Sequence, residues 1–600
     1  MFVFGIVGIL QATVLPGLIF SRLFKPQGGP AFRVAATFLI SMLVNFLLVY
    51  VLNWVHLYVR PVMLAIVIVE LFTIIILYRS SLKTNFDDVG RKISRYISSL
   101  GQSTQDIFNG TSSSPAAKTL RGLIITVLAI LAVSLVWWFF KRAVNSIGTV
   151  FNAWDAVFSW NSWAQIWAQG QFPEVEGLYP QLLPINLSLP YLFTSNLQVS
   201  FFSKFIVALF PLLTILVVFE QAFSEKKYGY FVATILVYLL YKKFLGDIVT
   251  EAYADIPVAF AGLMTVIPYL RNNRVLANRQ DTLLIFTFAA TAAVIKQPGI
   301  LLLGILAILA IIDGVRDKPT VKWLAICIGV AIAITLVGYI QKLGLALTDY
   351  GATGSPAYAE ITANAYDSTN LLDRLFYAFK SLEKYIVLFA FLIPATLLLN
   401  RKFKLLILAF VIPFTFTWAI LASYDTRNLA LVYPLVAISC GLSLQSIIDF
   451  CLSCLEKLRL GHWPSWLLPL VFIASVGTGG ILFTRQKITG AWVEKQKLIF
   501  SPVLNEQLYS LNFDNDCRFV LTNYPVRFLP GLESNMMNFY FDGIEAFHSY
   551  LEDPSICWIL IPPYAEQAIQ NEVDSKIQDG TYELIFGLED WVNYRLIKIR

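Results

Sequence analysis

The sequence predicts a mainly α-helical membrane protein: a bundle of about 14 transmembrane spans followed by a small α/β domain. Apolar residues make up 57% of the 600 residues, while charged residues are 14%, against about 25% in a typical soluble protein. Mean hydropathy is +0.66, and apolar runs of bilayer-crossing length recur as far as Phe483. After Phe483 the runs become short, rich in β-prone residues and separated by turn residues.

Fourteen apolar runs are expected to cross the membrane. They lie at residues 2–20, 33–54, 61–78, 121–140, 201–219, 229–245, 256–270, 283–295, 299–313, 323–347, 385–399, 405–421, 429–450 and 464–483. The first run has no charged leader or small-residue cleavage pattern, so it is expected to be a span and not a signal peptide.

Basic residues cluster in alternate loops, which places those loops in the cytoplasm and the N-terminus outside. The clusters are Arg22/Lys25/Arg33, Arg79/Lys83 through Arg121, Lys226/Lys227, Arg271/Arg274/Arg279, Arg316/Lys318/Lys322, Arg401/Lys402/Lys404 and Lys457/Arg459. Lys141/Arg142 and Lys242/Lys243 go against the pattern. The net charge of +6 is scattered among these loops and therefore does not indicate nucleic-acid binding. The sequence thus predicts an integral protein of the plasma (inner) membrane.

Three regions are expected. Residues 1–120 hold the first spans and a cytoplasmic loop at 84–120 that is rich in Ser, Gly and Thr, and residues 121–483 form the main transmembrane region. Residues 484–600 form the small α/β domain on the extracytoplasmic side, with strands at 518–522, 556–561, 582–586 and 594–599 and helices near 502–511 and 564–577. Cys517 and Cys557 each open a strand there, and a disulfide between them and two free thiols are equally compatible with the sequence.

The stretch from Trp154 to Pro190 is too polar to cross a bilayer and too aromatic for a plain linker. It holds seven aromatic residues and four prolines, and its first aromatics recur at near-helical spacing. Residues 155–169 are therefore expected to form an amphipathic helix in the headgroup zone. Asp155 is the only carboxylate in the first half of this stretch.

Ionisable groups in or beside membrane spans are costly and are candidates for function. Four groups stand out on the predicted outer side: Asp155, the trio Asp247, Glu251 and Asp255, then Lys296, then Arg427. The trio has a spacing of four, which on one helix would stack three carboxylates on one face. Each group also has a purely structural interpretation. The aspartates are common helix caps, and the two cations are able to extend to the lipid headgroups.

Together these groups match the needs of sugar transfer from a lipid-linked phosphate. Lys296 and Arg427 are suited to hold the phosphate, Arg through a bidentate grip and Lys as a point charge. Asp155 is suited to take the proton of an attacking hydroxyl. Aromatic residues of the same stretch, Tyr179 among them, are suited to stack on sugar rings.

The pieces WDAVFSWNSWAQIWAQG with YPQLLP, EAYADIPVAF, VIKQPGILLL and YDTRNLALVYP, in that order, resemble the GT-C superfamily of polytopic glycosyltransferases, which includes protein O-mannosyltransferases and lipid A aminoarabinose transferases. The resemblance covers roughly residues 121–600. It implies a GT-C-like bundle and a polyprenyl-phosphate sugar donor. It also implies transfer, usually with inversion, to a glycan, lipid or protein acceptor on the outer face.

The resemblance also assigns roles. Asp155 would be the general base, Asp255 and Glu251 would bind substrate, and Lys296 and Arg427 would face the donor phosphate. A single Asp stands where many members carry an acidic pair, which leaves open whether a divalent cation such as Mg²⁺ or Mn²⁺ takes part. Gln297-Pro298 replaces a Glu that often follows the Lys, and three additional spans precede the matching region.

Other functions stay open at this point. A ligase that moves a whole oligosaccharide from a lipid carrier would use the same site. A secondary transporter would need polar groups at mid-membrane and paired halves, and no paired halves are evident in the sequence. A non-catalytic assembly subunit is the third alternative.

Overall fold

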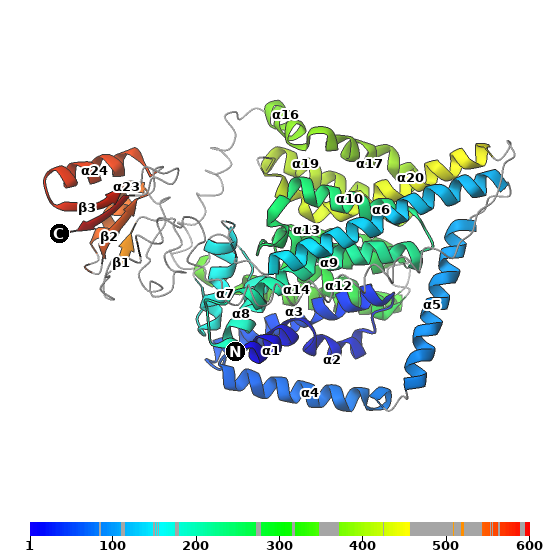
Figure 1. Ribbon diagram of the computed structural model, residues 1–600, viewed down its shortest axis with the longest axis horizontal. Coiled ribbons are helices and arrows are strands. Elements are labelled where there is room, and N and C mark those ends of the chain that lie inside the picture. The colour runs from blue at the N-terminus through cyan, green and yellow to red at the C-terminus, as the bar shows by residue number, and fades with distance from the viewer. Residues whose placement is uncertain are drawn as a thin grey trace. The chain divides into compact units, whose positions relative to one another are not determined.

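A computed structural model gives the fold (Figure 1). The structure describes residues 1–82, 86–109, 115–147, 151, 153, 155–173, 179–271, 278–314, 318–346, 371–423, 425–455, 508, 518–520, 543–552, 554, 556–561, 565–587 and 595–599. The chain divides into two compact units. The first comprises Met1–Thr149, Ser159–Leu197 and Phe201–Ala491, and the second comprises Val150–Phe158, Gln198–Ser200 and Trp492–Arg600.

The first unit is built from helices. They are α1 (Phe2–Thr13), α2 (Leu15–Phe24), α3 (Pro30–Trp54), α4 (Arg60–Leu82), α5 (Phe86–Asn109), α6 (Pro115–Ile147), α7 (Asn161–Ala168), α8 (Leu182–Thr194), α9 (Phe201–Ser224), α10 (Gly229–Phe244), α11 (Asp255–Arg271), α12 (Arg279–Ala293), α13 (Pro298–Gly314), α14 (Lys318–Ala346), α16 (Leu371–Leu382), α17 (Ile386–Leu398), α18 (Arg401–Leu406), α19 (Ile412–Leu421) and α20 (Tyr433–Leu455). Short turns of other helix types are η1 (Ala156–Trp160), η2 (Gly246–Thr250), η4 (Glu383–Tyr385), η5 (Ile407–Val411) and η6 (Thr426–Val432).

The predicted class, a polytopic helical membrane protein with a small α/β part, is confirmed. Thirteen of the 14 expected spans fall on helices, and the fourteenth, at 464–483, lies outside the described residues. Within the described part, nine helices or helix pairs are long and apolar enough to cross a membrane, beginning with Phe2–Phe24 and ending with Thr426–Ser453. The spans α10, α11 and α12 are only 15 to 17 residues long, which is short for the roughly 20 residues that a bilayer requires.

Small residues bring some of these helices into close contact. At the crossing of α10 and α20, a Cβ added to Gly229 would lie 2.6 Å from the Gly441 carbonyl oxygen, and one added to Gly441 would lie 2.3 Å from that of Gly229. Glycine at both positions lets the backbones approach where hydrophobic driving force between helices is weak.

The helices of the first unit have two distinguishable ends. At one end, which we call the Arg271 end, Arg271 donates to the Gln27 carbonyl and Glu220 accepts from the Phe32 backbone. This end therefore joins the start of α3 to the last turns of α9 and α11. At the opposite end, which we call the Lys296 end, the start of α9 contacts Glu251 just before α11, and the first residue of α11 contacts Lys296 in the chain that follows α12.

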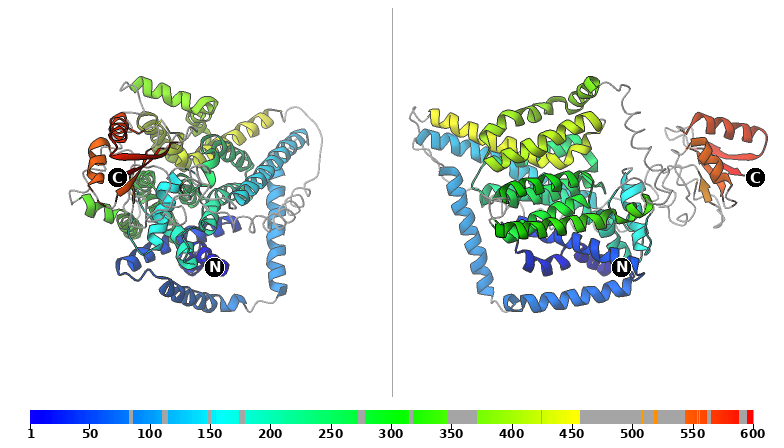
Figure 2. Two further views of the ribbon diagram at one scale, coloured as in Figure 1. Left: turned by 60° about the vertical axis from the view of Figure 1, so that its left-hand side comes forward. Right: turned by 180° about the vertical axis from the view of Figure 1, so that it is seen from behind.

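Two stretches expected to be loops are helical. Residues 84–120 contain α5, which crosses the Arg271 end between α4 and α6 (Figures 1 and 2). Apolar residues recur there every three or four positions, at Val89, Ile93, Ile97 and Leu100, so the periodicity outweighs the Ser-rich composition. Within the stretch from Trp154 to Pro190, α8 is fully buried although it contains Pro190.

The amphipathic helix expected over 155–169 is only partly confirmed. The segment is helical, as η1 and α7, but the polar side chains of α7 point into the protein. Asn161 Oδ1 accepts from the Tyr191 hydroxyl at 2.6 Å, and Gln165 donates to the Leu197 carbonyl at 2.8 Å. Trp167 is fully buried against Tyr50 of α3. Because protein groups satisfy this polar face, α7 does not present it to lipid headgroups.

The second unit contains a four-stranded sheet with the order β1-β2-β4-β3, formed by β1 (Arg518–Val520), β2 (Ile556–Ile561), β3 (Tyr582–Gly587) and β4 (Arg595–Ile599). β1 and β2 are parallel, and the other two pairings are antiparallel. Helices α23 (Gly543–Leu551) and α24 (Gln567–Gln578) share a core with the sheet, in which Phe547, Ile569 and Val573 are buried with strand residues. All four expected strands and the helix near 564–577 are confirmed. Cys557 is disulfide-bonded, while Cys517 lies outside the described residues.

Candidate functional site

A buried ammonium–carboxylate pair occupies the Lys296 end. Lys296 Nζ donates to Asp255 Oδ1 at 2.6 Å and lies 3.4 Å from Asn428 Oδ1. The side chains of Lys296 and Asp255 are only 11% and 6% exposed. An isolated charge at this depth would carry a desolvation cost of several kcal/mol, so each group stabilises the ionised form of the other. Lys296 therefore does not extend to the headgroups, which was the structural alternative.

A tight turn between α12 and α13 positions Lys296. The Lys296 backbone N–H donates to the Ala292 carbonyl at 3.2 Å, and its own carbonyl accepts from Gly299 at 2.9 Å. A Cβ added to Gly299 would lie 2.2 Å from the Ala292 carbonyl oxygen. Only glycine allows this approach of α13 to α12, and the approach fixes where the lysine side chain begins.

The carboxylate trio does not share one helical face, contrary to the expectation. Gly246 has a φ of +50°, and the chain then forms the 3₁₀ turn η2, which ends at Thr250. Glu251 is extended, with φ −93° and ψ 165°, and a new helix, α11, begins at Asp255. Asp255 lies in the first turn of α11, as its structural interpretation predicted. The side chain of Asp247 lies outside the described residues.

Glu251 instead pairs with a lysine that the sequence analysis did not select. Lys204 Nζ of α9 donates to Glu251 Oε1 at 2.6 Å, and the two side chains are 0% and 8% exposed. The signal was present in the sequence, because Lys204 is an ionisable residue inside the apolar run FFSKFIVALF. Lys204 lies within a predicted span, whereas the candidate residues were those of the predicted outer loops.

Arg427 is held by a carboxylate two residues away. Asp425 Oδ2 accepts from both Nε and Nη2 of Arg427 at 2.5 Å, and Asp425 Oδ1 accepts from the Arg427 backbone N–H at 2.9 Å. The guanidinium lies 4.8 Å from the centre of the Tyr253 ring, which is a cation–π distance. Its side chain is 29% exposed, more than that of Lys296. Asp425 and Tyr253 are further members of the site that sequence reasoning did not select.

These contacts join into one group of polar residues, which we call the Lys296 cluster: Lys204, Glu251, Tyr253, Asp255, Lys296, Asp425, Arg427 and Asn428. Asn428 links its two halves, since it follows Arg427 in η6 and its side chain faces Lys296. The structure thus brings four predicted residues together: Glu251, Asp255, Lys296 and Arg427. The cluster offers cations held by carboxylates, an arrangement suited to binding an anion.

The other predicted residues lie elsewhere. Tyr179 belongs to the first unit, where its ring centre is 5.5 Å from that of Trp160 and 6.2 Å from that of Trp163. Asp155 belongs to the second unit and directly precedes η1. Its predicted meeting with Lys296 and Arg427 therefore stays a prediction.

Within the described ranges, no group of three or more His, Cys, Asp or Glu side chains could hold a metal ion. Participation of Mg²⁺ or Mn²⁺ stays a prediction.

Comparison with known proteins gives similarities to a family model and to solved structures. A model for a family of unknown function, DUF6541, matches residues 10–184. The chain is also similar to the crystal structure of ArnT from Cupriavidus metallidurans bound to undecaprenyl phosphate. The sequences are 14% identical, the TM-score is 0.48, and the similarity covers 79% of this chain and 97% of that chain. No curated protein matches this chain.

Proposed function

We propose that this chain is a membrane glycosyltransferase of the GT-C type. It would transfer a sugar from a polyprenyl-phosphate donor to a glycan, lipid or protein acceptor at the extracytoplasmic face of the plasma (inner) membrane. The observation that carries the proposal is the Lys296 cluster, in which two buried lysines and a partly exposed arginine from separate segments of the chain lie at one end of the helices. Such groups are costly within a membrane protein and are expected to serve function.

In this proposal the Lys296 cluster binds the donor phosphate. Asp255 and Asp425 hold the two cations in place while the site is empty. An arriving phosphate would compete first for the Lys296–Asn428 contact, which at 3.4 Å is longer than the 2.6 Å contact between Lys296 and Asp255. Arg427 is the more exposed cation and presents a planar group suited to two phosphate oxygens. Glu251 would act indirectly, by holding Lys204 beside the start of α11.

The proposed chemistry is a displacement at the sugar carbon attached to phosphate. Asp155 would accept the proton of the acceptor hydroxyl as its oxygen forms the new bond to that carbon. The bond from the carbon to the phosphate oxygen breaks, and the electron pair leaves with the polyprenyl phosphate, whose negative charge Lys296 and Arg427 would stabilise. Tyr179, with Trp160 and Trp163, would provide an aromatic surface for a sugar ring.

The test uses purified protein in lipid nanodiscs with a panel of radiolabelled polyprenyl-phosphate sugars. We expect loss of label from at least one donor, and we expect Asp155→Asn to abolish that loss at an unchanged protein level. An EDTA arm tests the divalent cation. Failure of the whole panel to bind or react with the wild-type protein would reject the proposal. Turnover that survives in Asp155→Asn would reject the assigned base and leave the reaction class standing.

A further inference from the structure

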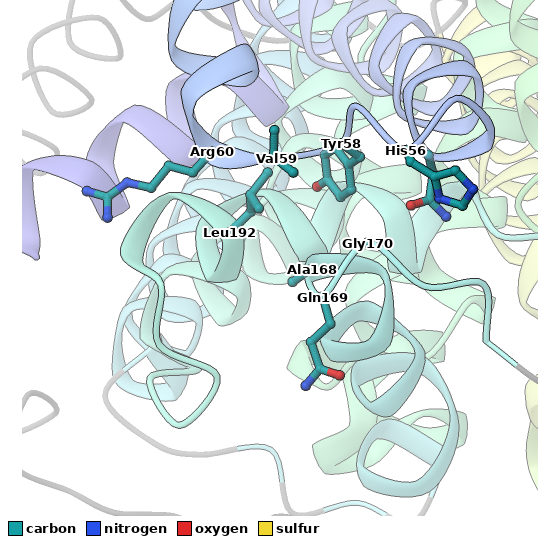
Figure 3. Close-up of a pocket in the computed structure, with 9 residues that line it drawn as sticks. His56, Tyr58, Val59, Arg60, Ala168, Gln169, Gly170 and Leu192 are labelled. Atoms are coloured by element: carbon teal, nitrogen blue, oxygen red, sulfur yellow. The ribbon is translucent and has the colours of Figure 1, made fainter.

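A hollow with both polar and apolar lining residues lies apart from the Lys296 cluster, on segments to which no role has been assigned. It has a volume of about 310 Å³ and is lined by the α3–α4 turn from Asn53 to Arg60, by Ala168 to Gly170 at the end of α7, and by Leu192 of α8 (Figure 3). This volume is at the lower end of the roughly 300–1,000 Å³ of small-molecule sites. It suits one or two small rings.

The buried amide of Asn53 indicates that this hollow binds a ligand. Asn53 is 1% exposed, and neither its Oδ1 nor its Nδ2 has a hydrogen-bond partner among the described residues. A buried polar group without a partner costs about 1–3 kcal/mol, so native structures rarely retain one without a reason. Gly170, just after α7, lies next to this amide, because a Cβ added there would be in ordinary van der Waals contact with Asn53 Oδ1, at 3.8 Å. Gly170 has a φ of +73°, a conformation that favours glycine.

The polar groups of the hollow favour an uncharged ligand that both donates and accepts hydrogen bonds. Among the described residues, its lining contains the amides of Asn53 and Gln169 and the imidazole of His56, and no carboxylate. Arg60, a cationic group of the lining, donates to Ser195 Oγ at 3.0 Å and lies 4.0 Å from the centre of the Phe4 ring. Figure 3 shows the Arg60 side chain directed away from His56. The Asn53 amide, which has no hydrogen-bond partner among the described residues, is complementary to a hydroxyl group, which can accept from Nδ2 and donate to Oδ1.

The hollow is connected to the same end of the helices as the Lys296 cluster. Trp167, one turn before Gly170, donates to Gln181 Oε1 at 3.1 Å. The next residue, Leu182, donates its backbone N–H to the Val294 carbonyl at 3.4 Å, two residues before Lys296. Both sites therefore belong to the Lys296 end, which the distribution of basic residues predicts to be the outer one.

We propose that this hollow is a binding site for a neutral sugar ring, with Asn53 as its main recognition residue and Gln169 as a second. In the proposed reaction the ring belongs to the acceptor, and that assignment alone rests on the proposed function. The site itself follows from the buried amide and from a described lining without carboxylates, in which Arg60 donates to Ser195, whatever the reaction.

The test measures binding by saturation-transfer NMR, with the protein in nanodiscs free of sugar-headgroup detergent. The probes are the methyl glycosides of glucose, mannose and N-acetylglucosamine, with inorganic phosphate as the charged comparison. We expect at least one glycoside to bind the wild-type protein. Asn53→Leu should weaken that binding about tenfold or more, and it should raise the melting temperature because two buried polar atoms without partners are removed. A residue that merely supports the fold would lower the melting temperature on the same change.

Asn145→Leu is the matched control, since Asn145 also has a buried amide oxygen without a partner but does not line the hollow. It should leave glycoside binding unchanged. Gln169→Ala, at an exposed position, serves if Asn53→Leu proves unstable, and should weaken binding several-fold. The proposal is overturned if no glycoside binds the wild-type protein, if both pocket variants bind as the wild type does, or if phosphate alone binds in an Asn53-dependent manner.

The source of the sugar is resolved by competition with the same sugar carried on diacylglycerol in the nanodisc. Competition would support a site for a lipid-borne sugar, and its absence a site for a soluble glycan. Glycoside binding through Asn53 in a protein that turns over no donor would overturn the proposed transferase and leave this site intact. Donor turnover without glycoside binding would overturn this sugar site and leave the proposed transferase intact.

Discussion

The two ends of the helical unit use buried carboxylates in different ways. At the Arg271 end, Glu220 accepts from the backbone N–H groups of Ala31 and Phe32 at 2.8 and 2.9 Å. These donors belong to the first turn of α3, where no intrahelical carbonyl is available to them. At the Lys296 end, the carboxylates of Asp255 and Glu251 instead hold lysine side chains.

This difference separates a structural role from a functional one. A carboxylate bound to backbone N–H groups completes a helix, and removing it leaves donors that have no alternative partner. A carboxylate bound to a lysine or arginine holds a side chain that can exchange its partner for an incoming anion. We therefore expect changes at the Lys296 end to affect donor use, and changes at the Arg271 end to affect stability alone.

The largest effect is expected for Lys296→Met. Donor kcat/KM should fall at least about a hundredfold, because a charge-assisted hydrogen bond to phosphate is lost. The protein should also lose about 3–5 kcal/mol of stability, since Asp255 would remain buried without its partner. Steady-state kinetics and thermal unfolding in nanodiscs measure the two effects.

Two further variants separate those effects. Lys296→Met combined with Asp255→Leu should recover most of the stability, because no unpaired charge remains, without recovering activity. Lys226→Met is the matched control, since it removes an exposed lysine that pairs with Asp106 at the Arg271 end. Recovery of activity in the double variant would show that Lys296 only supports the fold.

Arg427→Ala is expected to weaken donor binding about tenfold to a hundredfold, and more than Asp155→Asn does. Arg427 is assigned to the phosphate, which is bound before reaction, whereas Asp155 is assigned to a proton transferred only during reaction. Equilibrium binding of an unreactive polyprenyl phosphate checks the order. Equal affinity in the two variants would contradict the assigned roles.

Helices and strands were largely predictable from the sequence. Span positions follow from apolar runs, and the four strands follow from short β-prone runs, so both were predicted closely. Helix α8 was missed because Pro184 and Pro190 suggested a loop. In the structure Pro184 lies near the start of the helix. Pro190 lies within the helix, where all neighbouring residues are buried.

Ion-pair partners were much less predictable. Spacing suggested that Glu251 and Asp255 share a face, but the positive φ of Gly246 and the turn after it direct them to different lysines. Lys204 and Lys296 are 92 residues apart by their numbering and meet in the Lys296 cluster only through the packing of α9 against α11. Such pairing depends on tertiary structure, which residue spacing alone does not determine.

Glu220→Ala should lower the free energy of unfolding by about 1–3 kcal/mol for loss of the contacts to the start of α3. Donor kcat/KM measured well below the unfolding temperature should stay within about twofold of the wild-type value. Glu225→Ala, five residues further along the chain, is the control for loss of a carboxylate at the same end. A large fall in kcat/KM for Glu220→Ala would remove the distinction between the two ends.

The smallest effect is expected at Tyr253, whose aromatic ring contacts the Arg427 guanidinium at the Lys296 end. Its face lies 4.8 Å from the Arg427 guanidinium, and a cation–π contact at a partly exposed site is worth about 0.5–1 kcal/mol. Tyr253→Leu should therefore raise the donor KM only about two- to fivefold, while Tyr253→Phe, which keeps the ring, should match the wild type. If Phe behaves like Leu, the hydroxyl matters and the ring does not. If neither variant changes KM, Asp425 alone is sufficient to orient Arg427.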